Sequence, residues 1–223
     1  LWGCDKINLG SFGDTNPHLH FHIVPKYEGG FEFGGSFAIT NPEPVLLSEG
    51  EYQEMIAALR EKLAAQQLAQ SFCGIGHTRW ATHGEPSDVN SYPHSTPRVS
   101  IVHNGIIENY RELIADYELE SVLKSETDSE VVAALLNKFY TGDPDEAIKK
   151  TVSKLKGTFA LVILFEDHQG EIYSVRNVSP IVATLCKEGA MLASDLTALC
   201  RFTNRYFVVP EYHILKLAKD AIV

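Results

Sequence analysis

Residues 74–86 form the part of the chain best equipped to bind and orient a small polar molecule. Two histidines, an arginine, a tryptophan, two threonines and three glycines occur within these 13 positions. The run has no apolar periodicity, so it predicts neither a plain strand nor a helix. Its glycines let the backbone approach a ligand, and the guanidinium of Arg79 offers a planar set of donors for a carboxylate. The alternative interpretation is a surface loop in which Arg79 stacks on Trp80.

A second group of reactive side chains is the row of histidines at every second position from His18 to His22. Alternate side chains of a strand share one face, so a strand here would place three imidazoles on one face and Leu19, Phe21 and Ile23 on the other. A zinc site, a phosphate-handling site and an exposed strand that carries histidines all fit this pattern.

Residues 74–86 closely resemble the signature GIGHTRWATHGEP of class II glutamine amidotransferases, in particular of glutaminase domains of the glucosamine-6-phosphate synthase type. Four further segments resemble that family in the same order, and the resemblance covers residues 71–223. These segments are residues 102–109 (VHNGIIEN), 125–130 (SETDSE), 154–161 (LKGTFAL after Lys154) and 193–195 (ASD).

The resemblance implies a role for each matching residue of a glutamine site. Arg79 is expected to bind the α-carboxylate and Asp128 to pair with the α-ammonium group. The side chain of Asn104 and the backbone N–H of Gly105 are expected to form an oxyanion hole. The residues expected to line or support the site are Trp80, Thr82 and His83.

The nucleophile of that family is the cysteine at the mature N-terminus, which is activated by its own α-amine. This chain begins with Leu1, and neither Cys4 nor Cys73 matches the family's position. We therefore expect a glutamine-binding domain with impaired turnover.

The first part of the chain resembles another family. Residues 5–8 and 16–27 (NPHLHFHIVPKY) are similar to the histidine-triad family of nucleotide hydrolases and nucleotidyl transferases, and the resemblance covers about residues 1–65. It implies that His20 attacks a phosphate and that a nucleotide is the partner of this segment. The supporting residues implied by the resemblance are Asn8, Asn16, His18 and His22.

The elements that must position these groups follow from local patterns. Residues 48–51 (SEGE) have the form of a capping box, which predicts a helix to about Ala69. Its stripe of Tyr52, Met55, Ile56, Leu59 and Leu63 is expected in a core.

In the second part, residues 98–103 should form a buried strand. Helices are expected at 109–119, at 128–140 with Asp128 as its cap, and at 144–157 with Pro144 in its first turn. A hairpin (158–165 and 171–176) follows, then strands at 181–185, 190–193, 206–209 and 213–217 and a helix at 196–202.

Together these patterns predict an α+β chain with two partial domains, residues 1–68 and 69–223. The resemblance implies that the second is an N-terminally truncated αββα sandwich of the N-terminal-nucleophile hydrolase type, preceded by a partial histidine-triad-like sheet and helix. A third reading is an inert composite or binding module. Because two incomplete cores would expose apolar surface, we expect a homo-oligomer.

Composition narrows the classes of partner. The net charge of −10 argues against nucleic acids and anionic membranes, and no apolar run reaches the ~20 residues of a membrane span. The four cysteines form no CxxC motif, which suits a cytoplasmic protein. We expect no metal and no cofactor.

Overall fold

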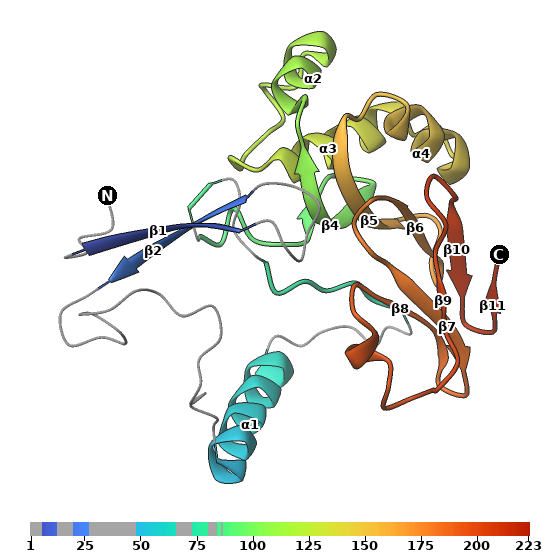
Figure 1. Cartoon of the computed structure of the whole chain (residues 1–223). Coiled ribbons are helices and arrows are strands. Elements are labelled where there is room, and N and C mark those ends of the chain that lie inside the picture. The colour runs from blue at the N-terminus through green and yellow to red at the C-terminus, as the bar shows by residue number, and fades with distance from the viewer. Residues whose placement is uncertain (1–5, 13–19, 27–47, 66–72, 80–83, 86) are drawn as a thin grey trace. The chain divides into compact units, whose positions relative to one another are not determined.

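The computed structural model describes residues 6–12, 20–26, 48–65, 73–79, 84–85 and 87–223. The chain divides into two compact units, residues 1–68 and residues 69–223 (Figure 1). Among the described residues no helix is long and apolar enough to cross a membrane.

The first unit contains an antiparallel pair of strands and one helix. Strand β1 (Lys6–Phe12) pairs with β2 (His20–Lys26), and Phe12 lies opposite His20. Helix α1 (Glu49–Ala65) begins at the predicted capping box. The N–H of Ser48 donates to Oε2 of Glu51 at 2.7 Å, and the N–H of Glu51 donates to Oγ of Ser48 at 3.3 Å. The capping box is therefore confirmed.

The predicted apolar stripe of α1 is not buried at the positions that the structure describes, whereas the side chains of Leu59 and Leu63 lie outside the described residues. The side chains of Tyr52, Met55 and Ile56 are 44%, 49% and 37% exposed. All residues of α1 whose burial is described are exposed, and the capping box satisfies backbone groups at the start of the helix. Strands β1 and β2 form a sheet of their own, which shares no strand pairing with the other sheets of the described chain.

The second unit contains two antiparallel sheets. The larger has the order β11-β10-β6-β5-β4-β3 and the smaller has the order β8-β7-β9. The strands of the larger sheet are β3 (His94–Ser95), β4 (Val99–Ile107), β5 (Gly157–Phe165), β6 (Ile172–Asn177), β10 (Leu215–Ala218) and β11 (Ala221–Ile222). The strands of the smaller are β7 (Val182–Cys186), β8 (Gly189–Ala193) and β9 (Phe207–Val208).

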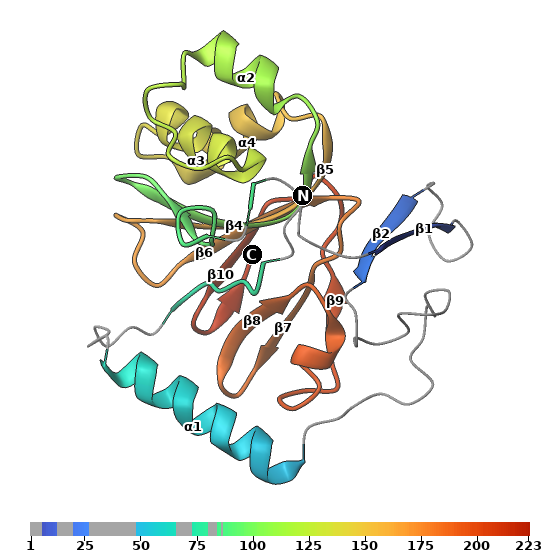
Figure 2. The ribbon, with the colours of Figure 1, turned by 90° about the vertical axis from the view of Figure 1, so that its left-hand side faces the viewer.

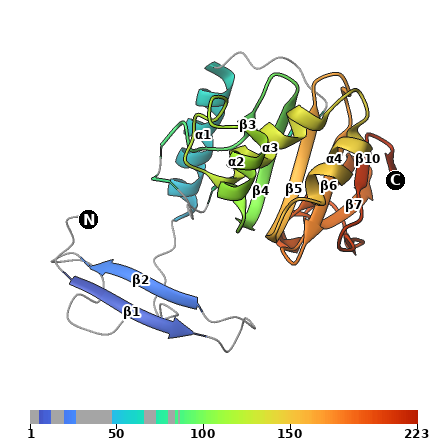
Figure 3. The same ribbon diagram turned by 90° about the horizontal axis from the view of Figure 1, so that it is seen from above.

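Helices α2 (Tyr110–Tyr117), α3 (Asp128–Phe139) and α4 (Pro144–Val152) cover one face of the larger sheet, and the smaller sheet lies on the other side (Figure 2). Seen from above, α3 and α4 run across the strands of the larger sheet (Figure 3). A short 3-10 helix, η1 (Leu196–Ala198), follows β8. The described residues of this unit thus form three of the four predicted layers, namely helices, sheet and sheet.

Strand β4 supplies both cores because its side chains alternate. Val99, Ile101 and Ile107 belong to the buried cluster shared with α3 and α4. Val102 belongs to a second buried cluster that also includes Ala183 of β7. The register of β4 against β5 is continuous from Val99 opposite Phe165 to Ile107 opposite Gly157. The predicted buried strand therefore exists and extends four residues further, to Ile107.

The predicted end of the third helix is wrong. Helix α4 ends at Val152, and Gly157 is already part of β5 with a φ of +112°. A Cβ on Gly157 would lie 2.2 Å from the carbonyl oxygen of Ile106. This glycine is needed because two strands approach closely there, and it does not stop a helix. The predicted β5–β6 hairpin is confirmed.

Candidate functional site

Three consecutive residues of β4 each present a different kind of group. Two side chains point to opposite faces of the sheet, and the third residue offers only its backbone. His103 lies on the helix side, where its Nδ1 is 2.8 Å from Oγ of Ser129 in α3. Asn104 points to the opposite face, where its Oδ1 is 2.7 Å from Nε2 of His77. Gly105 has no side chain and contributes only backbone groups. The candidate site is therefore built around the middle of a strand.

The segment that carries His77 and Arg79 is joined to Asn104 by one hydrogen bond and is braced internally by a second. The backbone N–H of Arg79 donates to Nδ1 of His77 at 2.7 Å, and Nε2 of His77 contacts Asn104. Arg79 has a φ of +52°, a left-handed conformation that is uncommon for a residue other than glycine. Such backbone strain occurs often at ligand sites.

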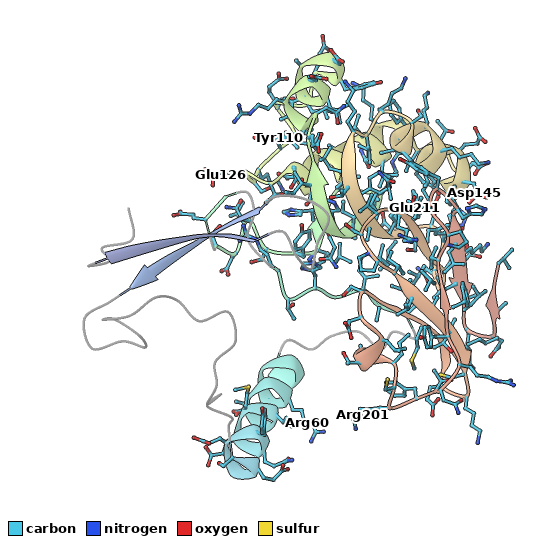
Figure 4. All side chains as sticks on the ribbon, in the orientation of Figure 1. Arg60, Tyr110, Glu126, Asp145, Arg201 and Glu211 are labelled. Carbon is cyan, nitrogen blue, oxygen red and sulfur yellow. The ribbon has the colours of Figure 1, made fainter. Side chains whose placement is uncertain are left out.

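The guanidinium of Arg79 is oriented by the loop that follows. Nη1 donates to the carbonyl of Glu85 at 3.1 Å and Nη2 to that of Gly84 at 3.0 Å. Asn90 holds this loop, because its Nδ2 donates to the carbonyl of Glu85 and its Oδ1 accepts from the N–H of Glu126. Glu126 is labelled in Figure 4. The planar donor group of Arg79 is thus oriented by the carbonyl groups of Gly84 and Glu85.

The N–H of Gly105 points away from β5. Backbone groups of alternate residues in an antiparallel strand face the same edge. The N–H of Ile107 leaves the ladder and donates to Oδ2 of Asp128 at 2.7 Å, whereas the N–H of Glu108 donates toward β5, to Lys156. Gly105 shares the edge of Ile107, so its N–H is directed to the edge that also carries the Asp128 carboxylate.

Asp128 does not cap α3, contrary to the prediction. The cap is Thr127, whose Oγ1 accepts from the N–H of Glu130 at 3.3 Å. Asp128 is the first helical residue, only 2% exposed, and its carboxylate accepts from Ile107 and from Oγ of Ser129. A buried carboxylate at a helix N-terminus is held by the helix dipole as well as by these donors.

A buried polar network supports this side of the site. The hydroxyl of Tyr92 and Oγ of Ser129 are 2.7 Å apart, and the Tyr92 ring lies against His77 with 4.2 Å between ring centroids. Nε2 of His94 is 2.9 Å from Oγ1 of Thr127. Burial lowers the pKa of His94, and burial lowers the pKa of His103 to about 4. Both imidazoles are therefore neutral near pH 7.

Four of the predicted site residues come together in the second unit. Arg79, Asn104, Gly105 and Asp128 are connected through His77 and β4, although the roles given to them remain predictions. Sequence reasoning assigned no role to His77, which lies in the same signature run. Trp80, Thr82, His83, Asn16 and His18 lie outside the described residues.

The remaining predicted residues belong to the first unit. Asn8 lies on β1, and His20 and His22 lie two positions apart on β2, which is the strand predicted for them. Alternate positions of a strand share a face, so the spacing expected for the histidine-triad resemblance is present in the backbone. A nucleotide function for this unit stays a prediction.

Cys73 lies at the other end of the sheet from Asn104. It lines a cavity with Val99, Phe165 and Gly170, and Asn104 is five residues along β4 from Val99, roughly 17 Å in an extended strand. Burial raises the pKa of the Cys73 thiol, which keeps it protonated and weakly nucleophilic. Cys73 is therefore a poor candidate for the nucleophile.

Comparison with known proteins identifies the family. A family model described as "Glutamine amidotransferase domain" matches residues 77–201. The chain belongs to this family, and the match includes the run that begins at His77.

The curated relatives are longer enzymes. The glutamine–fructose-6-phosphate aminotransferase [isomerizing] of Thermus thermophilus is 41% identical over 170 residues, which are 75% of this chain and 28% of that protein. The same enzyme of Thermotoga maritima is 38% identical over 194 residues, 86% of this chain and 31% of that protein. The chain thus spans less than a third of these relatives. The second unit makes up about 70% of the chain, so both matches include residues before 69.

Solved structures show the same fold. Glutamine phosphoribosylpyrophosphate (PRPP) amidotransferase from B. subtilis, complexed with ADP and GMP, has a TM-score of 0.56 and 23% identity, over 66% of this chain and 33% of that one. A structure of the allosteric regulatory enzyme of purine biosynthesis has a TM-score of 0.50 and 23% identity, over 60% of this chain and 30% of that one. The predicted amidotransferase fold is therefore confirmed, whereas the histidine-triad-like segment and the fourth layer stay predictions.

Proposed function

We propose that the second unit binds free glutamine and positions its side-chain amide for hydrolysis. The proposal rests on one observation: groups from three separate segments meet around the edge of β4. Arg79 is joined through His77 to Asn104, and Ile107 of the same strand is joined to Asp128. Membership of the glutamine amidotransferase domain family supports glutamine as the ligand.

Each charged group of free glutamine has a partner of opposite charge. The guanidinium of Arg79 pairs with the α-carboxylate, and the buried carboxylate of Asp128 pairs with the α-ammonium group. Nδ2 of Asn104 and the N–H of Gly105 donate to the oxygen of the amide carbon as negative charge develops there. We place Trp80, Thr82 and His83 around the same ligand by the family resemblance.

The proposal is limited to glutamine. The curated relatives' names include fructose 6-phosphate, but the chain covers less than a third of those enzymes, so the acceptor of the nitrogen is not assigned. The expectation of impaired turnover also stays a prediction, because no described residue is assigned as the nucleophile.

Calorimetric titration with glutamine tests the proposal. We expect saturable binding by the parent protein and binding at least about tenfold weaker in Arg79→Gln, because a charge-assisted hydrogen bond is lost. Arg111→Gln is the matched control, since Arg111 is an exposed arginine of α2 that contacts Tyr110. A parent protein that does not bind glutamine at millimolar concentration would refute the proposal. Equal binding by Arg79→Gln would refute the role of Arg79.

A further inference from the structure

The carboxamide of Asn104 could face His77 with its oxygen or with its nitrogen. A carboxamide has an oxygen that accepts and a nitrogen that donates, and only the nitrogen can stabilise an oxyanion. The contact between Oδ1 of Asn104 and Nε2 of His77 is 2.7 Å long, so it is a hydrogen bond that requires one donor. The donor is set by the protonation of the imidazole.

Arg79 determines that protonation. Its backbone N–H can only donate, and it lies 2.7 Å from Nδ1 of His77. Nδ1 must therefore be the nitrogen without a proton, and the neutral ring carries its proton on Nε2. Nε2–H then donates to Asn104, which faces it with its oxygen. The reversed carboxamide would place an N–H against an N–H.

The ring itself has little freedom to turn. The aromatic ring of Tyr92 lies 4.2 Å from the His77 ring between centroids, and the hydroxyl of Tyr92 is tied to Ser129. Ser129 follows Asp128 in α3, so the helix layer holds the plane of the imidazole. Among the described residues, nothing accepts a hydrogen bond from Nδ2 of Asn104.

We propose that His77 is a positioning residue for the reaction: it holds Asn104 with Nδ2 available as the oxyanion donor, and the backbone of Arg79 selects the required tautomer. This inference rests on the proposed function for its catalytic meaning. The residue that would bind the substrate carboxylate through its side chain thus also orients the oxyanion donor through its backbone.

The tautomer is tested without glutamine. A two-bond proton–nitrogen correlation spectrum of protein labelled uniformly with nitrogen-15 should show His77 protonated at Nε2 alone. The Asn104 carboxamide signals should shift in His77→Gln and remain in place in His168→Gln, a control at the β5–β6 turn. Protonation at Nδ1 would overturn the inference, because Arg79 could then no longer donate. This result does not depend on whether the protein binds glutamine.

The catalytic consequence is tested by glutamine turnover. His77→Leu should lower kcat by about 100-fold to 1,000-fold, as loss of one oxyanion donor does, with KM changed by less than about threefold. His77→Gln keeps a donor and should retain more of kcat than His77→Leu. An unchanged kcat in His77→Leu, or a loss confined to KM, would overturn the positioning role. A parent that binds glutamine without turnover would agree with the expected loss of the nucleophile, and the tautomer of His77 then decides the inference. A parent that does not bind glutamine would refute the proposed function and leave the tautomer test standing.

Discussion

Oδ2 of Asp128 accepts a hydrogen bond from the backbone N–H of Ile107 at 2.7 Å, although the two residues are 21 positions apart in the chain. The carboxylate therefore binds the edge of β4 two positions after Gly105. It also lies at the first turn of α3, so one side chain connects the sheet to the helix layer. This relationship allows the charge of Asp128 to be tested separately from its structural contact.

Asp128→Asn should weaken glutamine binding by about 10-fold to 100-fold, because the amide keeps an acceptor for Ile107 but loses the negative charge that pairs with an ammonium group. Calorimetric titration measures the change, and urea unfolding verifies that the fold is intact. Asp145→Asn is the control, since Asp145 is an exposed residue in the first turn of α4. Parent-like affinity in Asp128→Asn would exclude Asp128 from the ligand site.

Gly105→Ala should destabilise the second unit by at least about 2 kcal/mol. Gly105 has a φ of +134°, and a Cβ there would lie 2.1 Å from the carbonyl oxygen of Thr158. Gly142 has a φ of +108° with nothing within 4 Å of a Cβ, so Gly142→Ala measures backbone strain alone, about 1 kcal/mol. If urea unfolding showed the same loss of unfolding free energy in both variants, the close approach of β4 and β5 would add no cost to that of the backbone conformation.

Thr127→Val should cost more stability than the loss of a helix cap. The cap itself contributes about 1 kcal/mol, and the variant also leaves Nε2 of the buried His94 without its hydrogen-bond partner, which costs a further 1–3 kcal/mol, roughly. Asp143→Ala removes the exposed cap of α4 and leaves no buried histidine without its partner, so it serves as the reference for the cap contribution. Thr127→Val and Asp143→Ala would lose similar amounts of unfolding free energy if the hydrogen bond between Thr127 and His94 contributed nothing to stability.

Stability should fall as the pH is lowered from about 6.5 toward 4. The pKa of His103 is lowered from 6.5 to about 4 in the folded protein, so the unfolded chain binds a proton in this range that the folded protein does not. The loss reaches at most about 3 kcal/mol, and His94 contributes in the same direction. Urea unfolding at pH 7 and pH 5 should show a smaller difference for His103→Asn than for the parent protein. The same difference in both would assign the acid sensitivity to other groups.

The sequence predicted the positions of helices and strands better than the side-chain contacts between them. Periodicity and turn residues located the β5–β6 hairpin and the helix that begins at Asp128, because these depend on local patterns. The capping role of Asp128 was wrong because a partner 21 positions away takes its carboxylate. Tyr52, Met55 and Ile56 of α1 were misassigned to a core because spacing alone does not say whether a partner covers the stripe.

The candidate site shows the same division. The motifs named Arg79, Asn104 and Gly105, but no local pattern indicates that Asn104 and Gly105 lie in the middle of a strand. An Asn-Gly pair is more typical of a turn. His77 received no role because its importance comes from Asn104, 27 positions further along the chain. Side-chain direction and hydrogen-bond partners follow from tertiary packing, which spacing in the sequence does not specify.

The alternation of β4 has a consequence for how this chain can change length. A residue inserted between Val99 and His103 would turn every later side chain of the strand to the other face. His103 would leave Ser129, Asn104 would face the helices, and the N–H of Gly105 would point into the ladder. The turn between β5 and β6 carries no such constraint. Insertions and deletions should therefore be tolerated at that turn and absent from β4 in a library of variants selected for glutamine binding.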